Sequence, residues 1–320
     1  MLARGASLSA RRERNQRVMT RPFRHEVIAT TAQGLSPQPG APAIAPLGDA
    51  DEPEVRAFLR AGTVDTVVMN GLIADNGLES PFNRGTFYGC RDHEGQLIGV
   101  ALIGHATLFE TQHETVLAAF ARLAQGYERA HVVVGTPDKV ERFWWHYGAG
   151  GQKPRLICRE LFLEQRWPVA ALAPVADLRR ATLDDLPSVM SVNARLAFIE
   201  SGVDPLEADP EGFRLRLARR IEQGRVWVWC ERGRLLFKAD VLAETAEMNY
   251  LEGIYVHPDE RGKGYGSRGL SQLGRELLKE TRAICLLVNE QNKDAQRFFF
   301  RNGYKLRDCY DTIFLRPKEN

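Results

Sequence analysis

The residues best suited to chemistry lie in one short stretch, residues 251–267, with the sequence LEGIYVHPDERGKGYGS. An apolar run stops at Pro258, because proline cannot donate a hydrogen bond to a strand ladder. Gly262, Gly264 and Gly266 then precede a segment of helical period. Glycines leave backbone N–H groups uncovered at the start of a helix, where the helix dipole also attracts anions. The pattern predicts a phosphate cradle, and with it a nucleotide-bearing cofactor.

The spacing of this loop excludes two familiar kinds of phosphate site. A P-loop would end in Gly-Lys-Ser or Gly-Lys-Thr after a gap of four residues, and that ending is missing. A dinucleotide-binding fold would place a carboxylate about 20 residues further on, at the end of a strand, and none stands there. The loop instead reads R-x-x-G-x-G.

The elements around the loop form one crossover unit. Leu270, Leu273 and Leu277 recur at helical spacing after the loop. Residues 283–288 are then continuously apolar, which is typical of a strand buried on both faces of a sheet. Strand, loop, helix and strand in this order predict one crossover that joins neighbouring strands.

A second motif follows that strand and gives the unit a family resemblance. Asn292 and Ala295 have the spacing N-x-x-A, and Gly303 and Tyr304 follow a short helical stretch. Together with the R-x-x-G-x-G loop, these offsets make roughly residues 178–316 resemble the GNAT superfamily of acetyl-coenzyme A-dependent acyltransferases.

The resemblance implies acetyl-coenzyme A as acyl donor and no metal. It implies that the loop holds the pyrophosphate, and that the preceding strand splays to free backbone groups for the acetyl oxygen and the pantetheine arm. The implied cofactor-binding residues are Ile254, Tyr255, Val256, Arg261, Gly262, Lys263, Gly264, Tyr265, Gly266, Ser267, Asn289, Asn292 and Phe299.

Glu252 is the candidate general base. Side chains alternate along a strand, so Tyr250, Glu252 and Ile254 are expected on one face, and Leu251, Gly253 and Tyr255 on the other. The run Tyr250-Leu251-Glu252 is similar to one in spermidine acetyltransferases, whose glutamate deprotonates the amine through water. The alternative is a solvated charge at a sheet edge.

The general acid is less well specified. GNAT enzymes commonly carry a tyrosine seven residues after the motif asparagine, and this chain has Phe299 there, which cannot donate a proton. We take Tyr304 as the candidate, with Tyr255, Tyr310 or water as alternatives. A coenzyme A thiol has a pKa of about 8.5, like cysteine, so its thiolate leaves tolerably without an acid.

The order of the elements repeats with a period of about 150 residues. We therefore predict an α/β (α+β) fold of two tandem GNAT-like modules, each a mixed twisted sheet flanked by helices. Residues 49–166 would be a degenerate module and 179–320 the catalytic domain, with a linker at 167–178 and a flexible tail at 1–48. The arginine-rich start of that tail could also suggest a transit peptide.

The first module lacks the glycine cradle. Glu110 and Glu114 stand at the corresponding place and would repel a pyrophosphate. The chain resembles bacterial tandem-GNAT proteins in which only the second module is active.

Composition limits the other function classes. A net charge of +2 gives no general case for binding nucleic acid or membranes. Five cysteines without paired metal spacing indicate a reducing compartment, and no apolar run is long enough to span a bilayer. We expect a cytoplasmic monomer or homodimer.

These observations predict transfer of an acetyl group to a primary amine of a small molecule or peptide by direct attack. The alternatives are a non-catalytic acyl-coenzyme A sensor or scaffold, and transfer of a longer acyl group. The basic residues of one helix would form a solvated face or select an acidic substrate: Arg214, Arg216, Arg219 and Arg220. The acids before it could attract a cationic amine: Asp204, Glu207 and Asp209.

Overall fold

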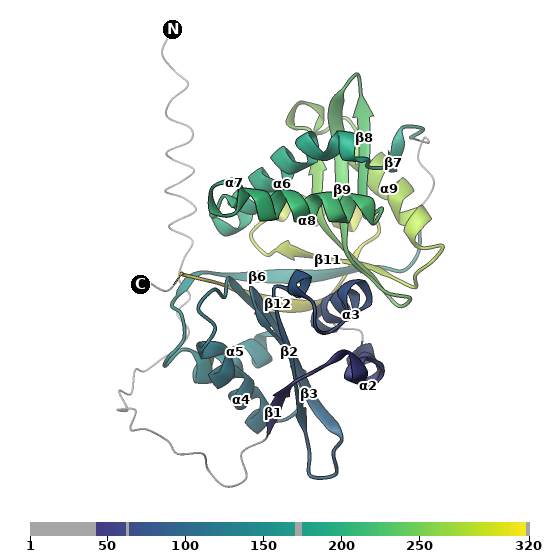
Figure 1. Cartoon of the computed structure of the whole chain (residues 1–320). Helices are drawn as coiled ribbons and strands as arrows, with labels where there is room; N and C mark the ends of the chain where they lie inside the picture. Colours follow the sequence, from purple (N-terminus) through teal and green to yellow (C-terminus); the bar gives the residue numbers. More distant parts are fainter. Residues whose placement is uncertain (1–42, 62–63, 170–174, 318–320) are drawn as a thin grey trace. The chain divides into compact units, whose positions relative to one another are not determined.

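The computed structural model describes residues 43–61, 64–169 and 175–317 (Figure 1). Most of the expected tail, residues 1–42, and residues 170–174 of the expected linker lie outside the described part. Strand β1 (Ile44–Pro46) pairs with β2, and Leu47 is buried. Residues 44–47, which were expected to belong to the tail, are therefore part of the fold.

The elements of the first half end in a long strand. They are α2 (Glu52–Phe58), α3 (Val64–Asn76), β2 (Gly85–Arg91), β3 (Leu97–Gly104), β4 (Ala106–Thr111), α4 (Glu114–Gln125), β5 (Val132–Gly135), α5 (Pro137–Tyr147) and β6 (Pro154–Gln165). Short 3-10 turns lie at Asp49–Asp51, Leu59–Ala61, Pro81–Asn83, Leu183–Asp185 and Pro258–Glu260.

The second half has a similar order. Its elements are β7 (Leu178–Arg180), α6 (Leu186–Ser201), α7 (Pro205–Ala208), α8 (Pro210–Glu222), β8 (Val226–Glu231), β9 (Arg234–Glu244), β10 (Asn249–Val256), α9 (Tyr265–Leu277), β11 (Ile284–Asn289), α10 (Lys293–Arg301) and β12 (Lys305–Leu315). The mixed α/β fold predicted from the sequence is confirmed.

The pairing of the strands repeats between the halves. In the first half β4 pairs antiparallel with β3 and parallel with β5, the latter over two residue pairs. In the second half β10 pairs antiparallel with β9 and parallel with β11, again over two residue pairs. Strand β4 is thus the counterpart of β10, and α4 is the counterpart of α9.

The last strand of each half joins the sheet of the other half. Strand β6 ends the first half but pairs with β11, and β12 ends the second half but pairs with β5. The two exchanged strands also pair antiparallel with each other. The result is one continuous sheet in the order β1-β2-β3-β4-β5-β12-β6-β11-β10-β9-β8-β7, and Figure 1 shows β6 and β12 side by side at its middle.

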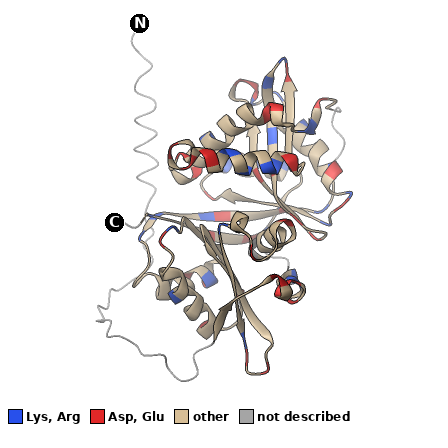
Figure 2. Ribbon diagram, viewed as in Figure 1, with Lys and Arg blue, Asp and Glu red and all other residues tan. Residues whose placement is uncertain are grey.

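Helices cover both faces of the sheet in the second half. On one face α6 and α8 contribute Val189 and Ile221 to a core with β8 and β9. On the other face α9 and α10 contribute Leu270, Leu273 and Phe299 to a larger core. Figure 2 shows acidic and basic residues interspersed along the ribbon, as the small net charge implies.

Candidate active site

The parallel strands β10 and β11 separate after a short paired stretch. They are in register only at Asn249 with Ile284 and at Tyr250 with Cys285. Beyond that point β10 pairs with β9 alone, and β11 pairs with β6. The splay occurs where the family resemblance implies it, and it leaves one side of β10 without a strand partner.

A bulge at Gly253 changes which side chains share a face. Glu252 pairs with Asp240 and Tyr255 with Lys238, so three steps along β10 match two along β9. An inserted residue exchanges the two faces of a strand from that point on. Gly253 has a φ of 58°, which favours glycine.

The predicted alternation is therefore wrong beyond the bulge. Ile254 packs against the core beneath α9, with Leu251. Tyr255 belongs to the core beneath α6 and α8, on the same face as Glu252. Regular alternation had placed these two residues the other way round.

A buried ion pair lies under the bulge. Lys238 Nζ is 2.7 Å from Asp240 Oδ1, and the two side chains are 0% and 1% exposed. The same ammonium group donates a hydrogen bond to the carbonyl of Gly253 at 3.0 Å. Asn193 of α6 donates to Asp240 Oδ2 at 2.9 Å. Lys238 thus ties the bulge on β10 to β9, and an ideal Cβ on Gly253 would lie 2.8 Å from Nζ.

Glu252 extends this network toward solvent. Its Oε1 accepts a hydrogen bond from Arg220 Nη1 at 2.5 Å, and the same guanidinium nitrogen lies 3.5 Å from Asp240. The Glu252 side chain is 36% exposed, so it is accessible from solvent while one side of it is held. Of the two expectations for Arg220, a solvated face or contact with an acidic substrate, the solvated face is wrong, because its side chain is 23% exposed and paired with Glu252.

Two more carboxylates lie around Glu252. Although Glu200 is exposed as a residue, desolvation by the surrounding protein raises the pKa of its carboxyl to about 7, and the charges of Glu252 and Glu160 act in the same direction. Burial also raises the pKa of Glu160, while a hydrogen bond from Thr312 opposes that rise. Glu160 reaches this region on β6, the exchanged strand.

The glycine loop has the form that the sequence predicts. Gly262 and Gly264 have φ values of 78° and 88°, and an ideal Cβ on either would meet no atom within 4 Å. Gly264 is the N-cap of α9 and supplies no side chain to cap it. The first N–H groups of a helix have no acceptor inside the helix. The start of α9 therefore presents bare donors to open space.

Cations flank this helix start. Arg261 Nε donates to the carbonyl of Val256 at 3.2 Å, and Lys263 pairs with Glu260 at 3.1 Å. Arg268 lies over the ring of Trp229, 5.0 Å from its centroid. Gly266 is a packing glycine, since an ideal Cβ there would lie 2.9 Å from Val256. Bare N–H groups with nearby cations fit a pyrophosphate.

The motif residues after β11 shape the local backbone. Asn289 Oδ1 accepts from Gln291 N at 2.8 Å, and Asn292 Oδ1 accepts from Ala295 N at 3.1 Å, which caps α10. Phe299 is 8% exposed and packs edge-on against Tyr304, with the ring centroids 5.6 Å apart. These contacts explain the motif locally, and a role in ligand binding stays a prediction.

The position of Tyr304 speaks against its predicted role as general acid. The residue is 2% exposed in the core, and burial raises the pKa of its hydroxyl far above the usual range. The hydroxyl has no hydrogen-bond partner among the described residues. Tyr310, one of the alternatives, is also buried, at 1% exposure. A buried phenol with a raised pKa is a weak acid, and it is a poor proton donor to a thiolate bound at the surface.

The first half has no counterpart of the cradle. Only two residues separate β4 from α4, and neither is glycine. Glu110 is buried there and paired with Lys139 at 2.7 Å, while Glu114 lies within 3.3 Å of Arg142. Carboxylates thus stand where the second half has open N–H groups.

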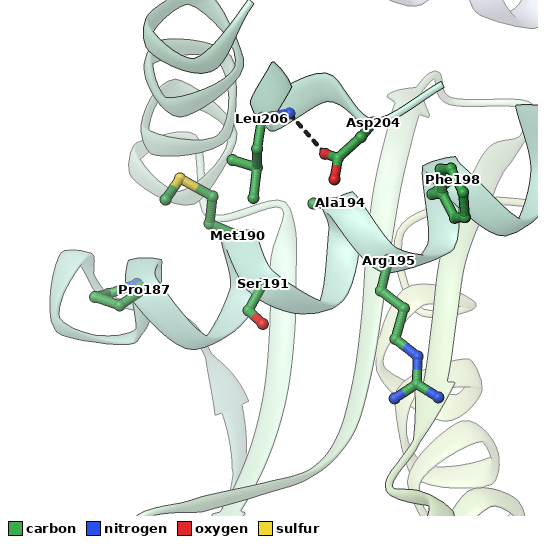
Figure 3. A pocket seen from close by; sticks show the side chains of 8 residues that line it. All are labelled: Pro187, Met190, Ser191, Ala194, Arg195, Phe198, Asp204 and Leu206. Carbon is green, nitrogen blue, oxygen red and sulfur yellow. Dashed lines mark hydrogen bonds between the residues drawn. The ribbon is translucent and has the colours of Figure 1, made fainter. Parts of the chain in front are cut away.

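A pocket of about 370 Å³ lies beside α6 (Figure 3). Asp204 lines it, but its carboxylate accepts a hydrogen bond from Leu206 N at 2.8 Å and so caps α7. Asp209 likewise caps α8 through Gly212 N at 3.1 Å. The remaining lining residues are Pro187, Met190, Ser191, Ala194, Arg195, Phe198 and Leu206. Two of the three loop acids therefore have local structural roles.

The described residues contain no group of His, Cys, Asp and Glu side chains that could hold a metal ion. All five cysteines are free thiols. Within the same described ranges, every helix is too short or too polar to cross a bilayer.

Sequence comparison gives one match. The family model described as acetyltransferase (GNAT) domain matches residues 222–306, which contain the splayed strands and the glycine loop. Comparison with curated proteins gives no match.

Several solved structures share the fold over most of the chain. A protein of Drosophila melanogaster aligns with a TM-score of 0.64 and 13% identity, over 86% of this chain and 99% of its own. An acetyltransferase of the GNAT family from Colwellia psychrerythraea aligns at 0.56 and 12%, over 86% and 100%. A tandem GNAT protein from the clavulanic acid biosynthesis pathway aligns at 0.54 and 14%, over 87% and 100%.

Proposed function

Because the chain is a GNAT protein whose family domain lies at residues 222–306, we propose that its second half transfers an acetyl group from acetyl-coenzyme A to a primary amine. The observation that carries this proposal is the open, uncapped start of α9 directly after the splay of β10 from β11. Helix start and splay together would accommodate a pyrophosphate and an extended thioester arm.

In this proposal the bare N–H groups from Gly262 to Ser267 bind the pyrophosphate. A backbone N–H on the unpaired side of β10, near Ile254, polarises the thioester carbonyl. Loss of one such rigid donor costs about 3 kcal/mol of transition-state stabilisation in comparable sites. Holding amine and thioester together supplies roughly 7–11 kcal/mol more.

Glu252 is proposed as the base that takes a proton from the attacking amine, directly or through water. Its position two residues before Ile254, on the solvent side of the Lys238–Asp240 network, suits this role. We leave the thiolate without a protein acid, because Tyr304 is buried and the thiol pKa of about 8.5 makes the thiolate a tolerable leaving group.

The division of labour between the halves is also part of the proposal. Residues 179–320 would carry the reaction, and residues 49–166 would be a GNAT-like module without a cofactor site. The acceptor would be a small molecule or a peptide, and the protein would act in the cytoplasm as a monomer or homodimer.

Cofactor binding is tested with Gly264→Glu, which places a carboxylate at the start of α9. Gly233→Glu is the matched control, because Gly233 also has a positive φ, of 72°, and open space around it, in the turn between β8 and β9. Calorimetry should show acetyl-coenzyme A binding to the control and to the parent, but not to Gly264→Glu. Equal affinity in all three would remove the cradle assignment.

Catalysis is tested with Glu252→Gln and a panel of amines. Removal of a general base is expected to lower kcat by roughly 10²-fold, with little change in the affinity for acetyl-coenzyme A. An unchanged kcat rejects the base. If the parent protein binds the cofactor but transfers nothing to any amine, the sensor or scaffold alternative gains support. Panels with longer acyl donors then test whether the protein transfers a longer acyl group instead.

A further inference from the structure

A chain of basic and aromatic side chains connects the first half to the carboxy-terminal end of α6. We name Arg84, His105, His131, Arg155 and Arg216 the basic cluster. Arg84 Nη2 is 3.0 Å from Nδ1 of His105, whose ring stacks on His131 with centroids 4.8 Å apart and planes 1° from parallel.

The contacts continue from His131 to the exchanged strands. The edge of His131 meets Phe314 of β12, with the centroids 5.6 Å apart. The Arg155 guanidinium of β6 lies over the same ring, 5.8 Å from its centroid. Arg155 Nη1 also donates to the carbonyl of Ser201, the last residue of α6.

The positive charges of this cluster are poorly balanced. Among the described residues, no carboxylate forms an ion pair with Arg84 or Arg155, and Nε and Nη2 of Arg155 are buried without a hydrogen-bond partner. Arg216 is paired with Asp209 at 2.9 Å. Three guanidinium groups thus have one carboxylate between them.

The titration of these groups reflects the imbalance. Burial, and then the charge of Arg216, lower the pKa of Arg84 to about 10. Burial, and then Arg84, lower the pKa of His105 to about 3, so its ring is neutral and Nδ1 can accept from Arg84. Buried charges in proteins are normally paired, and a guanidinium fork matches a carboxylate or phosphate.

The basic cluster adjoins the acidic side of the proposed acceptor region. Ser201, which Arg155 contacts, follows Glu200, and the Glu200 carboxyl responds to the charges of Glu252 and Glu160. A molecule running along the end of α6 would therefore meet carboxylates near Glu252 and guanidinium groups beyond Ser201.

We propose that the basic cluster binds an anionic group, a carboxylate or a phosphate, at the end of the acceptor remote from its reacting amine. The assignment of this anionic group to the acceptor rests on the proposed function, whereas the anion site itself does not. The acceptor class is then an amine that also carries an acid group.

The anion site is tested without any acetyl transfer. The protein is studied as Gly264→Glu, so that anions cannot bind at α9, and is titrated separately with inorganic phosphate and acetate at constant ionic strength set by chloride. A saturable rise in Tm is expected. Arg84→Met and Arg155→Met should each weaken the apparent affinity about tenfold, since each removes a charged hydrogen-bond donor.

The control is Arg214→Met, which removes an equal charge from α8. Arg214 is exposed and paired with Glu211 outside the cluster. It should leave the titration unchanged. The site is overturned if the Tm shows no saturable rise, or if the rise persists in both Arg84→Met and Arg155→Met. The probe with the higher apparent affinity identifies phosphate or carboxylate as the preferred group.

The prediction that the acceptor carries the anionic group is tested with pairs of amines that differ only in a distal acid group. The parent protein should show a higher kcat/KM for the acidic member of a pair, and Arg84→Met should remove that preference. Equal kcat/KM values for both members overturn the assignment of the anion to the acceptor. Saturable anion binding with no transfer to any amine overturns the proposed function and leaves the anion site standing.

Discussion

Replacing Lys238 with methionine removes one half of a buried ion pair while keeping most of the side-chain volume. Asp240 would be left charged at 1% exposure, with Asn193 as a hydrogen-bond donor and Arg220 3.5 Å away. Breaking a buried pair in this way typically costs about 3–5 kcal/mol. Because Arg220 still compensates part of the charge, we expect the lower end, about 3 kcal/mol.

The measurement is thermal and urea-induced unfolding of Lys238→Met. For a domain of this size a loss of 3 kcal/mol corresponds to a fall in Tm of roughly 6 °C. Lys279→Met is the control, because it breaks an ion pair with Glu276 whose partners are 64% and 44% exposed. Such surface pairs contribute less than about 1 kcal/mol.

A second variant isolates the charge. Lys238→Met with Asp240→Asn removes both charges, so it should recover at least about 1 kcal/mol relative to Lys238→Met alone. The reasoning is refuted if Lys238→Met costs less than about 1 kcal/mol, or if the double variant is no more stable than the single one.

Three further outcomes follow from the structure. The pKa of Glu200 is raised to about 7, so between about pH 4.3 and pH 7 the folded protein holds a proton that the unfolded chain has released, and stability falls as the pH rises through this range. The Tm of Glu200→Gln, measured relative to the parent, should therefore increase between pH 5 and pH 8. A constant difference in Tm would contradict the shift. Gly253→Ala places an alanine at a φ of 58° and brings its Cβ to 2.8 Å from the Lys238 ammonium. Denaturant titration should show a loss of unfolding free energy about 1 kcal/mol larger than for Gly233→Ala, where the space is open. Equal losses would mean that the ammonium moves freely. A fragment of residues 175–320 lacks both β5 and β6, so calorimetry should show no cooperative unfolding transition, and a sharp transition would show that the half folds alone.

The glycine loop could be located because its form depends on local sequence, whereas the splay was implied by the family resemblance. Gly264 needs a positive φ at the helix start, and Pro258 ends the apolar run before it, so spacing alone locates the loop. The bulge at Gly253 could not be located in the same way. Strand alternation assumes a regular register, and a glycine in a strand signals a bulge without saying which face the next residues take.

The charged network under the bulge left only a weak signal in the sequence. Lys238 and Asp240 are two charges at alternate positions of an apolar strand, which indicates one common face but not that it is buried. Glu200 and the basic cluster were missed because their significance depends on contacts between distant segments. Tyr304 was taken as the acid from its offset alone, and offset says nothing about burial.

The exchange of β6 and β12 makes each half of the chain depend on the other. The final strand of the first half, β6, lies against β11 and carries Glu160 and Arg155 toward the second half. Deleting the first half would therefore remove a strand from the sheet of the second half. Each half completes the sheet of the other, so a substitution in β6 or β12 acts on both halves at once.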